Sequence, residues 1–284
     1  HDLSQAQKLE SLGQLAAGVA HEINTPTQFV GDNLRFLSDA FTDIGTLLDH
    51  HHTLLNSAKT GPCPQETIER CEVEAERVDL EYLQEEVPKA IAQSLDGVER
   101  IAKIVRAMKE FAHPGGDGPA YEDLNHAIRT TVEVSRNEWK YVADMTTDLA
   151  PDLPPIFCQL GPINQVVLNI IVNAAHAIGD VVKGTKQKGR ITISSRKAGD
   201  GVEIRISDTG GGIPETIREK IFDPFFTTKP VGKGTGQGLA IARAVVMDKH
   251  GGRIEVESQV DQGTTFIIRL PVKQRESPSL REAA

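Results

Sequence analysis

The sequence predicts a multidomain α plus α/β protein, a long antiparallel helical hairpin followed by an α/β sandwich. Apolar residues recur at steps of three and four from Leu9 to Met108, which is the spacing of a coiled-coil seam. Helix-like and strand-like segments then alternate from about Tyr121 to Val272. We therefore expect a hairpin at 1–113, a linker at 114–120, an α/β domain at 121–273 and a flexible tail at 274–284.

The hairpin is predicted from two apolar seams and the turn between them. The first seam covers residues 12–55, and an extra step of four residues after Pro26 is a stutter in its repeat. The second seam covers residues 80–108. Between them lies "KTGPCPQ" at residues 59–65, whose glycine and two prolines are typical of a turn.

Register and oligomeric state follow from these seams. With the turn centred near Cys63, His21 would lie opposite roughly Val105. One hairpin cannot cover a two-sided seam, whereas two hairpins can cover each other as a four-helix bundle, so we expect a homodimer. The acidic run at residues 66–86 is interpreted as a solvated helix face.

Composition narrows the function classes. A net charge of −9 argues against a nucleic-acid partner. The three cysteines have no metal-ligand spacing, which predicts reduced thiols in a cytosolic setting. We expect no apolar run long enough to span a bilayer and no signal peptide. The chain begins with His1 rather than Met, so we expect a cytoplasmic fragment whose parent protein could be membrane-anchored.

The stretch "GVAHEINTP" at residues 18–26 places a histidine off the seam. His21 lies two residues from both Val19 and Ile23, about 200° around the helix from each, so it should face solvent. Glu22 and Thr25 are expected within its reach, with Thr25 one turn above on the same face. The alternative is an ordinary surface histidine beside a tolerated proline kink.

The second half predicts a sandwich, because several of its strands are consecutive rather than separated by helices. The helix "NQVVLNIIVNAAHAI" is apolar almost all round, except for Asn169, Asn173 and His176 at i, i+4 and i+7. Buried amides without partners are costly, so this stripe needs a polar partner, and a magnesium-bound polyphosphate would satisfy it. The expected strands are 142–149, 190–196, 202–207, 252–257 and 264–270, with helices near 124–138, 159–182 and 236–249.

Two glycine-rich stretches follow that helix. "SDTGGGIP" places Asp208 at a strand end before three glycines, which alone would be a common turn. "FDPFFTTKPVGKGTGQGLAIA" places four glycines before a helix, where backbone amides can approach an anion. Their spacing is not that of a P-loop. The phenylalanines of the second stretch are interpreted most simply as core anchors, with a latch on a mobile loop as the alternative: Phe222, Phe225 and Phe226.

These motifs together resemble the catalytic core of a sensor histidine kinase of the two-component type. "HEINTP" resembles the phosphoacceptor box, "NQVVLNIIVNAAHAI" the asparagine box and "DTGGGIP" the first glycine box. "FDPFFTTK" is similar to the phenylalanine box, "GKGTGQGLAIA" to the second glycine box and "GTTFIIRLP" to the closing strand. The family order is kept over almost the whole chain, which implies a Bergerat-type ATP-binding domain.

The resemblance implies a nucleotide site for ATP and Mg²⁺. Asn169 and Asn173 would bind Mg²⁺ and phosphate oxygens, and Asp208 would accept from the adenine amino group. His176 stands where many members have a phosphate-contacting lysine. An ATP lid would cover roughly residues 223–237. The glycines that would shape the pocket or line the phosphates are Gly210, Gly212, Gly234, Gly236 and Gly238. Further implied binding residues are Phe225, Thr228, Lys229 and Leu239.

The resemblance also implies a reaction. His21 would accept the γ-phosphoryl group, Glu22 would orient its ring or take its proton, and Thr25 would position a water for dephosphorylating a response regulator. The phosphoryl group would pass to an aspartate of a receiver domain docked near residues 24–37. An upstream sensor domain would be missing from this fragment. Pro26 would let the helix bend beside the acceptor.

Three alternatives to this reading remain open. One is a phosphatase-dominant protein of the same fold, another a non-enzymatic adaptor with a vestigial nucleotide site, and the third a Bergerat-type kinase that phosphorylates serines. The first would lose phosphatase activity but keep His21 phosphorylation in Thr25→Ala. Titration with an ATP analogue tests the second, and acid lability of the phosphoprotein tests the third.

Overall fold

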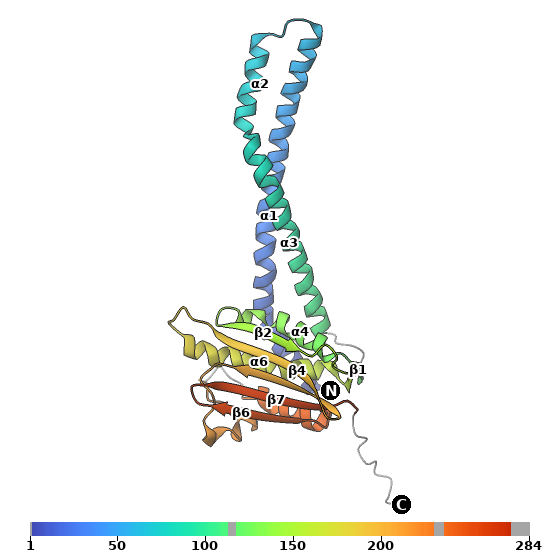
Figure 1. Cartoon of the computed structure of the whole chain (residues 1–284), viewed down its shortest axis with the longest axis vertical. Helices are drawn as coiled ribbons and strands as arrows, with labels where there is room; N and C mark the ends of the chain where they lie inside the picture. The colour runs from blue at the N-terminus through green and yellow to red at the C-terminus, as the bar shows by residue number, and fades with distance from the viewer. Residues whose placement is uncertain (1, 113–117, 230–235, 274–284) are drawn as a thin grey trace, which may run out of the picture. The chain divides into compact units, whose positions relative to one another are not determined.

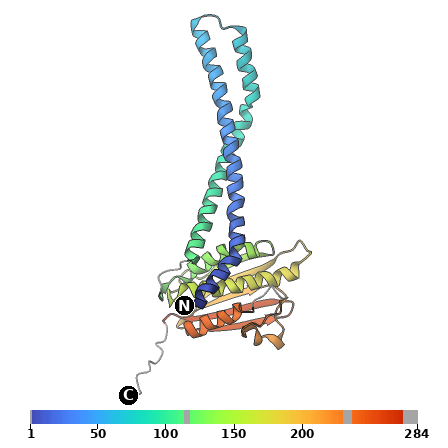
Figure 2. The same ribbon diagram turned by 180° about the vertical axis from the view of Figure 1, so that it is seen from behind.

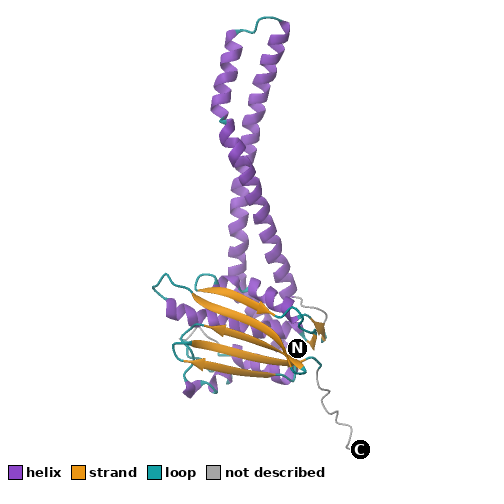
Figure 3. Cartoon of the chain, in the orientation of Figure 1, coloured by secondary structure: helices purple, strands orange, loops and turns teal. Residues whose placement is uncertain are grey.

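A computed structural model describes residues 2–112, 118–229 and 236–273 (Figures 1 and 3). A helical N-terminal region is followed by an α/β sandwich, as the sequence predicts. The chain divides into two compact units. One is the helical segment Ala20–Ile104, and the other combines Val105–Ala284 with the first residues, His1–Val19.

Three helices make up the hairpin region. They are α1 (Asp2–Thr60), α2 (Gln65–Val78) and α3 (Leu80–Ala112), and α1 continues through Pro26 without interruption. The turn between α1 and α2 falls at the predicted Pro- and Gly-rich stretch. A break that the sequence pattern did not predict separates α2 from α3 at Asp79, which adopts a left-handed conformation with φ 44°. Its carboxylate accepts from the backbone N–H of Tyr82 at 3.2 Å and so caps the start of α3.

An ion pair and a hydrogen bond fix the register between α1 and α3. Glu22 forms an ion pair with Arg100, and Asn33 donates to the backbone carbonyl of Ala90 at 3.2 Å. His21 therefore lies about one turn from the predicted level of Val105. Where the helices approach closely, α3 has a glycine: a Cβ at Gly97 would lie 2.7 Å from the Phe29 ring. One apolar cluster of this unit is formed by the buried residues Ala40, Leu47, Val78 and Leu83.

The sandwich is built on a five-stranded sheet in the order β2-β4-β5-β7-β6. β2 runs parallel to β4, and the other neighbours are antiparallel. All five predicted strands are present, as β2 (Ala143–Leu149), β4 (Gly189–Ala198), β5 (Gly201–Asp208), β6 (Arg253–Gln259) and β7 (Gly263–Pro271). A short antiparallel pair that the sequence did not predict joins β1 (Ala120–Glu122) to β3 (Ile156–Cys158).

Helices cover one face of this sheet (Figures 1 and 2). The long central helix, α6 (Leu160–Val182), shares one apolar core with the inward isoleucines of β4 and β5, which includes Ile171, Ile178, Ile191 and Ile204. The remaining helical elements are α4 (Leu124–Val134), α5 (Arg136–Trp139), α6 (Leu160–Val182), the 3₁₀ turns η1 (Glu215–Ile217) and η2 (Lys220–Phe222), α7 (Gly238–Ala244) and the π-helical turn η3 (Val245–Lys249).

The expectation that no apolar run could span a bilayer is wrong for α6. Among the described helices it alone is long and apolar enough by length and composition. Core packing accounts for that composition, because ten of its residues are buried inside the domain.

Candidate functional site

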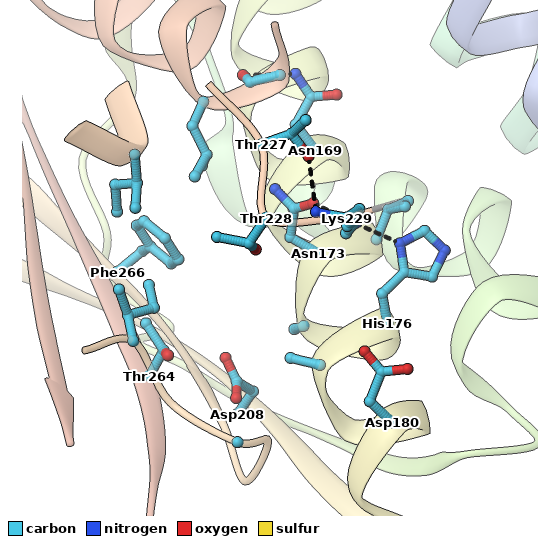
Figure 4. Close-up of a pocket in the computed structure, with 18 of the residues that line it drawn as sticks. Asn169, Asn173, His176, Asp180, Asp208, Thr227, Thr228, Lys229, Thr264 and Phe266 are labelled. Carbon is cyan, nitrogen blue, oxygen red and sulfur yellow. Dashed lines mark hydrogen bonds between the residues drawn. The ribbon is translucent and has the colours of Figure 1, made fainter. Parts of the chain in front are cut away.

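A cavity of about 1000 Å³ opens beside α6 in the α/β unit. Most of its wall comes from one face of α6, the loop after β5, the segment leading into α7, and the start of β7 (Figure 4). The short helical elements α5, η1 and η2 each add one residue. This size is at the upper end of the range for small-ligand sites and is sufficient for a nucleotide.

The polar stripe of α6 forms one wall. Asn169, Asn173 and His176 all line the cavity, as their helical spacing implies. Asn169 donates to the carbonyl of Gly238 at 3.0 Å and accepts from Gln165 at 2.9 Å. The stripe differs from expectation in burial: both asparagines are half-buried and His176 is exposed, because this face borders an open cavity rather than the core.

Asp208 lies at the other side of the cavity, at the carboxyl end of β5 (Figure 4). It is buried, and one carboxylate oxygen accepts from the backbone N–H of Gly210 at 2.8 Å. Burial raises the pKa of Asp208, although backbone N–H groups of Gly210 and Thr264 oppose the rise. A buried acceptor at a cavity wall can bind an amino group that arrives with a ligand.

Backbone geometry explains why two of the three positions after Asp208 require glycine. Gly212 lines the cavity with φ 71°, and a Cβ there would lie 2.1 Å from the carbonyl oxygen of Gln259. Gly210 is not a wall residue itself. A Cβ on it would lie 2.7 Å from the Cβ of Ala177, so it lets the loop pack directly on α6.

The predicted lid segment supplies another part of the wall, with Thr228, Lys229 and Gly236 lining the cavity. Gly238 and Leu239, the first two residues of α7, continue this wall. The remaining predicted lid glycine, Gly234, lies outside the described residues.

Phe225 stands apart from the other phenylalanines of this segment. It is 72% exposed, has φ 67° and does not line the cavity, so it is not a core anchor. Its backbone N–H donates to the carbonyl of Gly236 at 3.0 Å. Phe222 packs edge-on against Phe266 with ring centroids 6.4 Å apart, and Phe226 lines the cavity.

A lysine from this segment reaches across to α6. The Lys229 ammonium donates to the side-chain oxygen of Asn173 at 3.2 Å and to Nδ1 of His176 at 2.8 Å. Burial lowers the pKa of Lys229, against the raising effect of Asp180. Burial and the charge of Lys229 lower the pKa of His176, so its ring is suited to accept this hydrogen bond as neutral imidazole.

His21 and its neighbours lie in the helical unit. His21 is exposed, and the hydroxyl of Thr25 donates to its backbone carbonyl at 3.0 Å, so both occupy one face of α1. Glu22 is not placed as expected. It is buried and pairs with Arg100 on α3, because it lies about 100° further around the helix, on the side that packs against α3.

Sequence reasoning missed several wall residues. Thr264 and Phe266 belong to β7, and the strand alternation that points them inward could have identified them. Asp180 continues the α6 stripe one turn beyond His176. Glu138 also lines the cavity, and burial raises the pKa of its carboxyl. No spacing rule marks Glu138, since it comes from the separate short helix α5.

The donor set fits a magnesium ion that shares its ligands with a phosphate chain. The described residues contain no group of three or more His, Cys, Asp or Glu side chains that could hold a metal alone. Asn169 and Asn173 offer amide oxygens one turn apart at the cavity, and Mg²⁺ prefers oxygen ligands, several of them from water and phosphate. In this structure, N–H donors of Gln165 and Lys229 contact those oxygens.

Comparison with known proteins supplies the family. Residues 159–274 match the family described as histidine kinase-, DNA gyrase B-, and HSP90-like ATPase. The sensor histidine kinase ZraS of Escherichia coli K12 is 30% identical over 95% of this chain and 48% of its own length. The C4-dicarboxylate transport sensor protein DctB of Rhizobium meliloti is 31% identical over 95% of this chain and 36% of its own length.

A solved catalytic domain of the histidine kinase ThkA is 31% identical, with a TM-score of 0.47, and covers 55% of this chain and 97% of that one. The chain spans about half the length of the curated relatives, or less. The motifs, the ATPase family match and the two curated relatives lead to one conclusion: the chain belongs to the sensor histidine kinases and carries their ATP-binding catalytic domain.

Proposed function

We propose that the chain transfers the terminal phosphoryl group of ATP to His21, and that an aspartate of a response-regulator receiver domain then accepts it. The observation that carries the proposal is an exposed imidazole on α1 in a chain that also has a nucleotide-sized cavity with Asn169, Asn173 and Asp208 in its walls. We further propose residues 1–113 as the dimerisation and phosphoacceptor hairpin and 121–273 as the ATP-binding domain.

The two sides of the cavity suggest how ATP is held. The buried carboxyl of Asp208 accepts from the adenine amino group. Across the cavity, Asn169 and Asn173 would hold Mg²⁺ beside the phosphates, and the metal would neutralise phosphate charge. Backbone amides at Gly236 and Gly238 lie beside the same wall, at the start of α7, where helix-terminal N–H groups favour anions.

At the acceptor, a ring nitrogen of His21 attacks the γ-phosphorus in line. A P–N bond forms, the bond to the bridging oxygen breaks and ADP leaves. The imidazole also loses its N–H proton. Glu22 can take that proton only after releasing Arg100, so its participation depends on the contact between α1 and α3.

We also propose that the chain works as a homodimer. Leu34, Phe41, Leu48 and Leu55 follow one another at seven-residue intervals on α1, and all four are exposed. Ile91, Leu95 and Val98 of α3 are exposed as well. Exposed apolar heptads are what a second hairpin covers in a four-helix bundle.

The test is incubation with γ-labelled ATP and Mg²⁺. Wild type should gain label that is lost in acid and kept in base, as expected for a P–N bond, and His21→Gln should gain none. His52→Gln is the matched control, since it also changes an exposed histidine of α1. Label that survives in His21→Gln, or that resists acid, contradicts the proposal and points to a different acceptor.

Regulator dephosphorylation is a second candidate activity, favoured by the exposed Thr25 on the face of His21. Thr25→Ala should slow loss of phosphate from a phosphorylated receiver domain while sparing His21 labelling. Thr25→Ser keeps the hydroxyl and serves as the control. A non-enzymatic adaptor would show no label at all, and a serine kinase would give an acid-stable product.

A further inference from the structure

Two carboxyl groups in the cavity wall have no part in the proposed function. They are Asp180, one turn beyond His176 on α6, and Glu138 of the short helix α5. We propose that these two carboxyls bind the ribose hydroxyls of the nucleotide, so that the site selects ribonucleotides over deoxyribonucleotides. The inference rests on the proposed function, in which the cavity holds ATP.

Both carboxyls have oxygens available to a ligand. Within residues 2–112, 118–229 and 236–273, no group donates a hydrogen bond to Asp180 or Glu138. Burial raises the pKa of Glu138, so this carboxyl is already partly removed from water. An acceptor that faces a cavity without a partner is stabilised when a ligand brings a donor to it.

The chemistry of ATP leaves few donors for these oxygens. Carboxylates repel phosphate groups, so neither side chain is expected to contact the triphosphate. The donors of ATP at neutral pH are the adenine amino group and the two ribose hydroxyls. Asp208 is proposed to accept from the amino group, which leaves the hydroxyls. Carboxylates accept from ribose hydroxyls in the same way in dinucleotide-binding folds.

The position of Asp180 along α6 agrees with a ribose. About 10 Å of helix separates it from Asn173, where Mg²⁺ and the phosphates are proposed to bind. Figure 4 shows Asp180 and Asn169 at opposite ends of the polar stripe, with Asp208 on the facing wall. Burial and Lys229 lower the pKa of His176, and the charge of Asp180 opposes them, so the Asp180 carboxylate lies close to that ring.

Glu138 approaches the same end of the cavity from a different element. Helix α5 packs against α6 and ends three residues before Val142. A Cβ on Gly179, the neighbour of Asp180, would lie 3.6 Å from a methyl group of Val142. The fold therefore brings Glu138 and Asp180 to one end of α6, and two acceptors from two elements suit the two neighbouring hydroxyls of a ribose.

The experiment is calorimetric titration of the whole chain with ADP, 2′-deoxy-ADP and 3′-deoxy-ADP, each with Mg²⁺. ADP carries the same adenosine as ATP but lacks the phosphoryl group that is transferred, so binding is measured without turnover. Wild type should bind ADP roughly 3- to 10-fold more tightly than either deoxy form, as expected for loss of one hydrogen bond.

Each carboxyl is tested by comparing the three nucleotides. Asp180→Ala should weaken ADP binding by about 3- to 10-fold and leave one deoxy form within about 2-fold of wild type, and Glu138→Ala should do the same with the other deoxy form. A carboxylate that only repels phosphate would change all three affinities by the same factor. Asp248→Ala is the matched control, because Asp248 is exposed and does not line the cavity.

Equal binding of the three nucleotides by wild type overturns the inference, and so do equal changes for all three in either variant. If the selectivity is found but His21 gains no label from ATP, the proposed phosphotransfer fails while the inference stands. If His21 is labelled but wild type does not discriminate among the three nucleotides, the reverse holds. A wild-type chain that binds none of them overturns both.

Discussion

His250 shows how one buried side chain can join two elements of the ATP-binding domain. Its Nδ1 is 2.8 Å from the carbonyl of Val245, which can only accept, and its Nε2 is 3.0 Å from the backbone N–H of Gln159, which can only donate. The neutral tautomer with the proton on Nδ1 is the form that satisfies both. The ring therefore ties the start of α6 to the turn after α7.

This geometry makes domain stability depend on pH. Burial, together with the charge of Lys249, lowers the pKa of His250, although the bond to Val245 opposes the shift. A lowered folded pKa means that the unfolded chain binds the proton more readily. The contribution of His250 is therefore fully present above its unfolded pKa of about 6.5 and decreases as pH falls toward the folded pKa.

We expect the melting temperature of the wild type to fall between pH 7.5 and pH 5.5, and His250→Gln to show a smaller fall from a lower starting value. Loss of the two hydrogen bonds should cost roughly 1–3 kcal/mol. Thermal unfolding followed by circular dichroism at both pH values measures this. His52→Gln should behave as wild type, and an unchanged pH dependence in His250→Gln would refute the assignment.

At the scale of elements, periodicity predicted nearly every long helix and strand. The five strands of the main sheet and α6 fall within two or three residues of their expected bounds. The break at Asp79 was missed because apolar Val78 and Leu80 flank it and the helical pattern of α3 begins at once. The β1–β3 pair was missed because three-residue strands carry no readable alternation.

Part of the candidate site could likewise be predicted from the sequence, and part could not. Helical spacing sufficed to place Asn169, Asn173 and His176 on one face, because it depends only on local geometry. The link from Lys229 to His176 could not be predicted, since it depends on how a distant loop folds back onto α6. Counting residues also predicted the exposure of His21 but not the partner of Glu22, which required the register of α3.

The Glu22–Arg100 pair leads to a prediction about the contact between α1 and α3. Arg100→Ala removes a charged partner of the buried Glu22 carboxylate and should lower the free energy of unfolding by roughly 1–3 kcal/mol. This is less than for a fully buried pair, because Arg100 is 37% exposed. Urea denaturation measures the loss.

Arg35→Ala provides the matched control, since Arg35 forms an exposed ion pair with Asp32 within α1. It should change stability by about 0.5 kcal/mol or less. Equal losses in the two variants would mean that the Glu22–Arg100 contact contributes no more than a surface pair. Glu22 would then be free to move toward His21 at little cost.

At the scale of the whole molecule, the two compact units differ in how completely they bury their apolar residues. The α/β unit has one large core around α6, with isoleucines of β4, β5 and β7 almost fully buried. In the helical unit the buried apolar residues are fewer and smaller, for example the cluster of Ala40, Leu47, Val78 and Leu83, while the side chain of Phe41 is 80% exposed. A pair of helices that leaves such residues exposed is marginal by itself, and the homodimer proposed above would cover them.

This asymmetry predicts that oligomeric state depends on the exposed heptads. Phe41→Glu and Leu48→Glu each place a charge in the expected interface. Because the expected dimer has twofold symmetry, each variant carries its substitution in both subunits, so two charges enter the interface. Burial of one such side chain contributes roughly 1.5–3 kcal/mol, so each variant should weaken the dimer by well over tenfold. Thr42→Glu, next to Phe41 but off the heptad, should leave the dimer intact.

Sedimentation equilibrium across a range of concentrations measures the association. Wild type that sediments as a monomer, or Phe41→Glu that remains as dimeric as Thr42→Glu, would show that something other than a second hairpin covers this face.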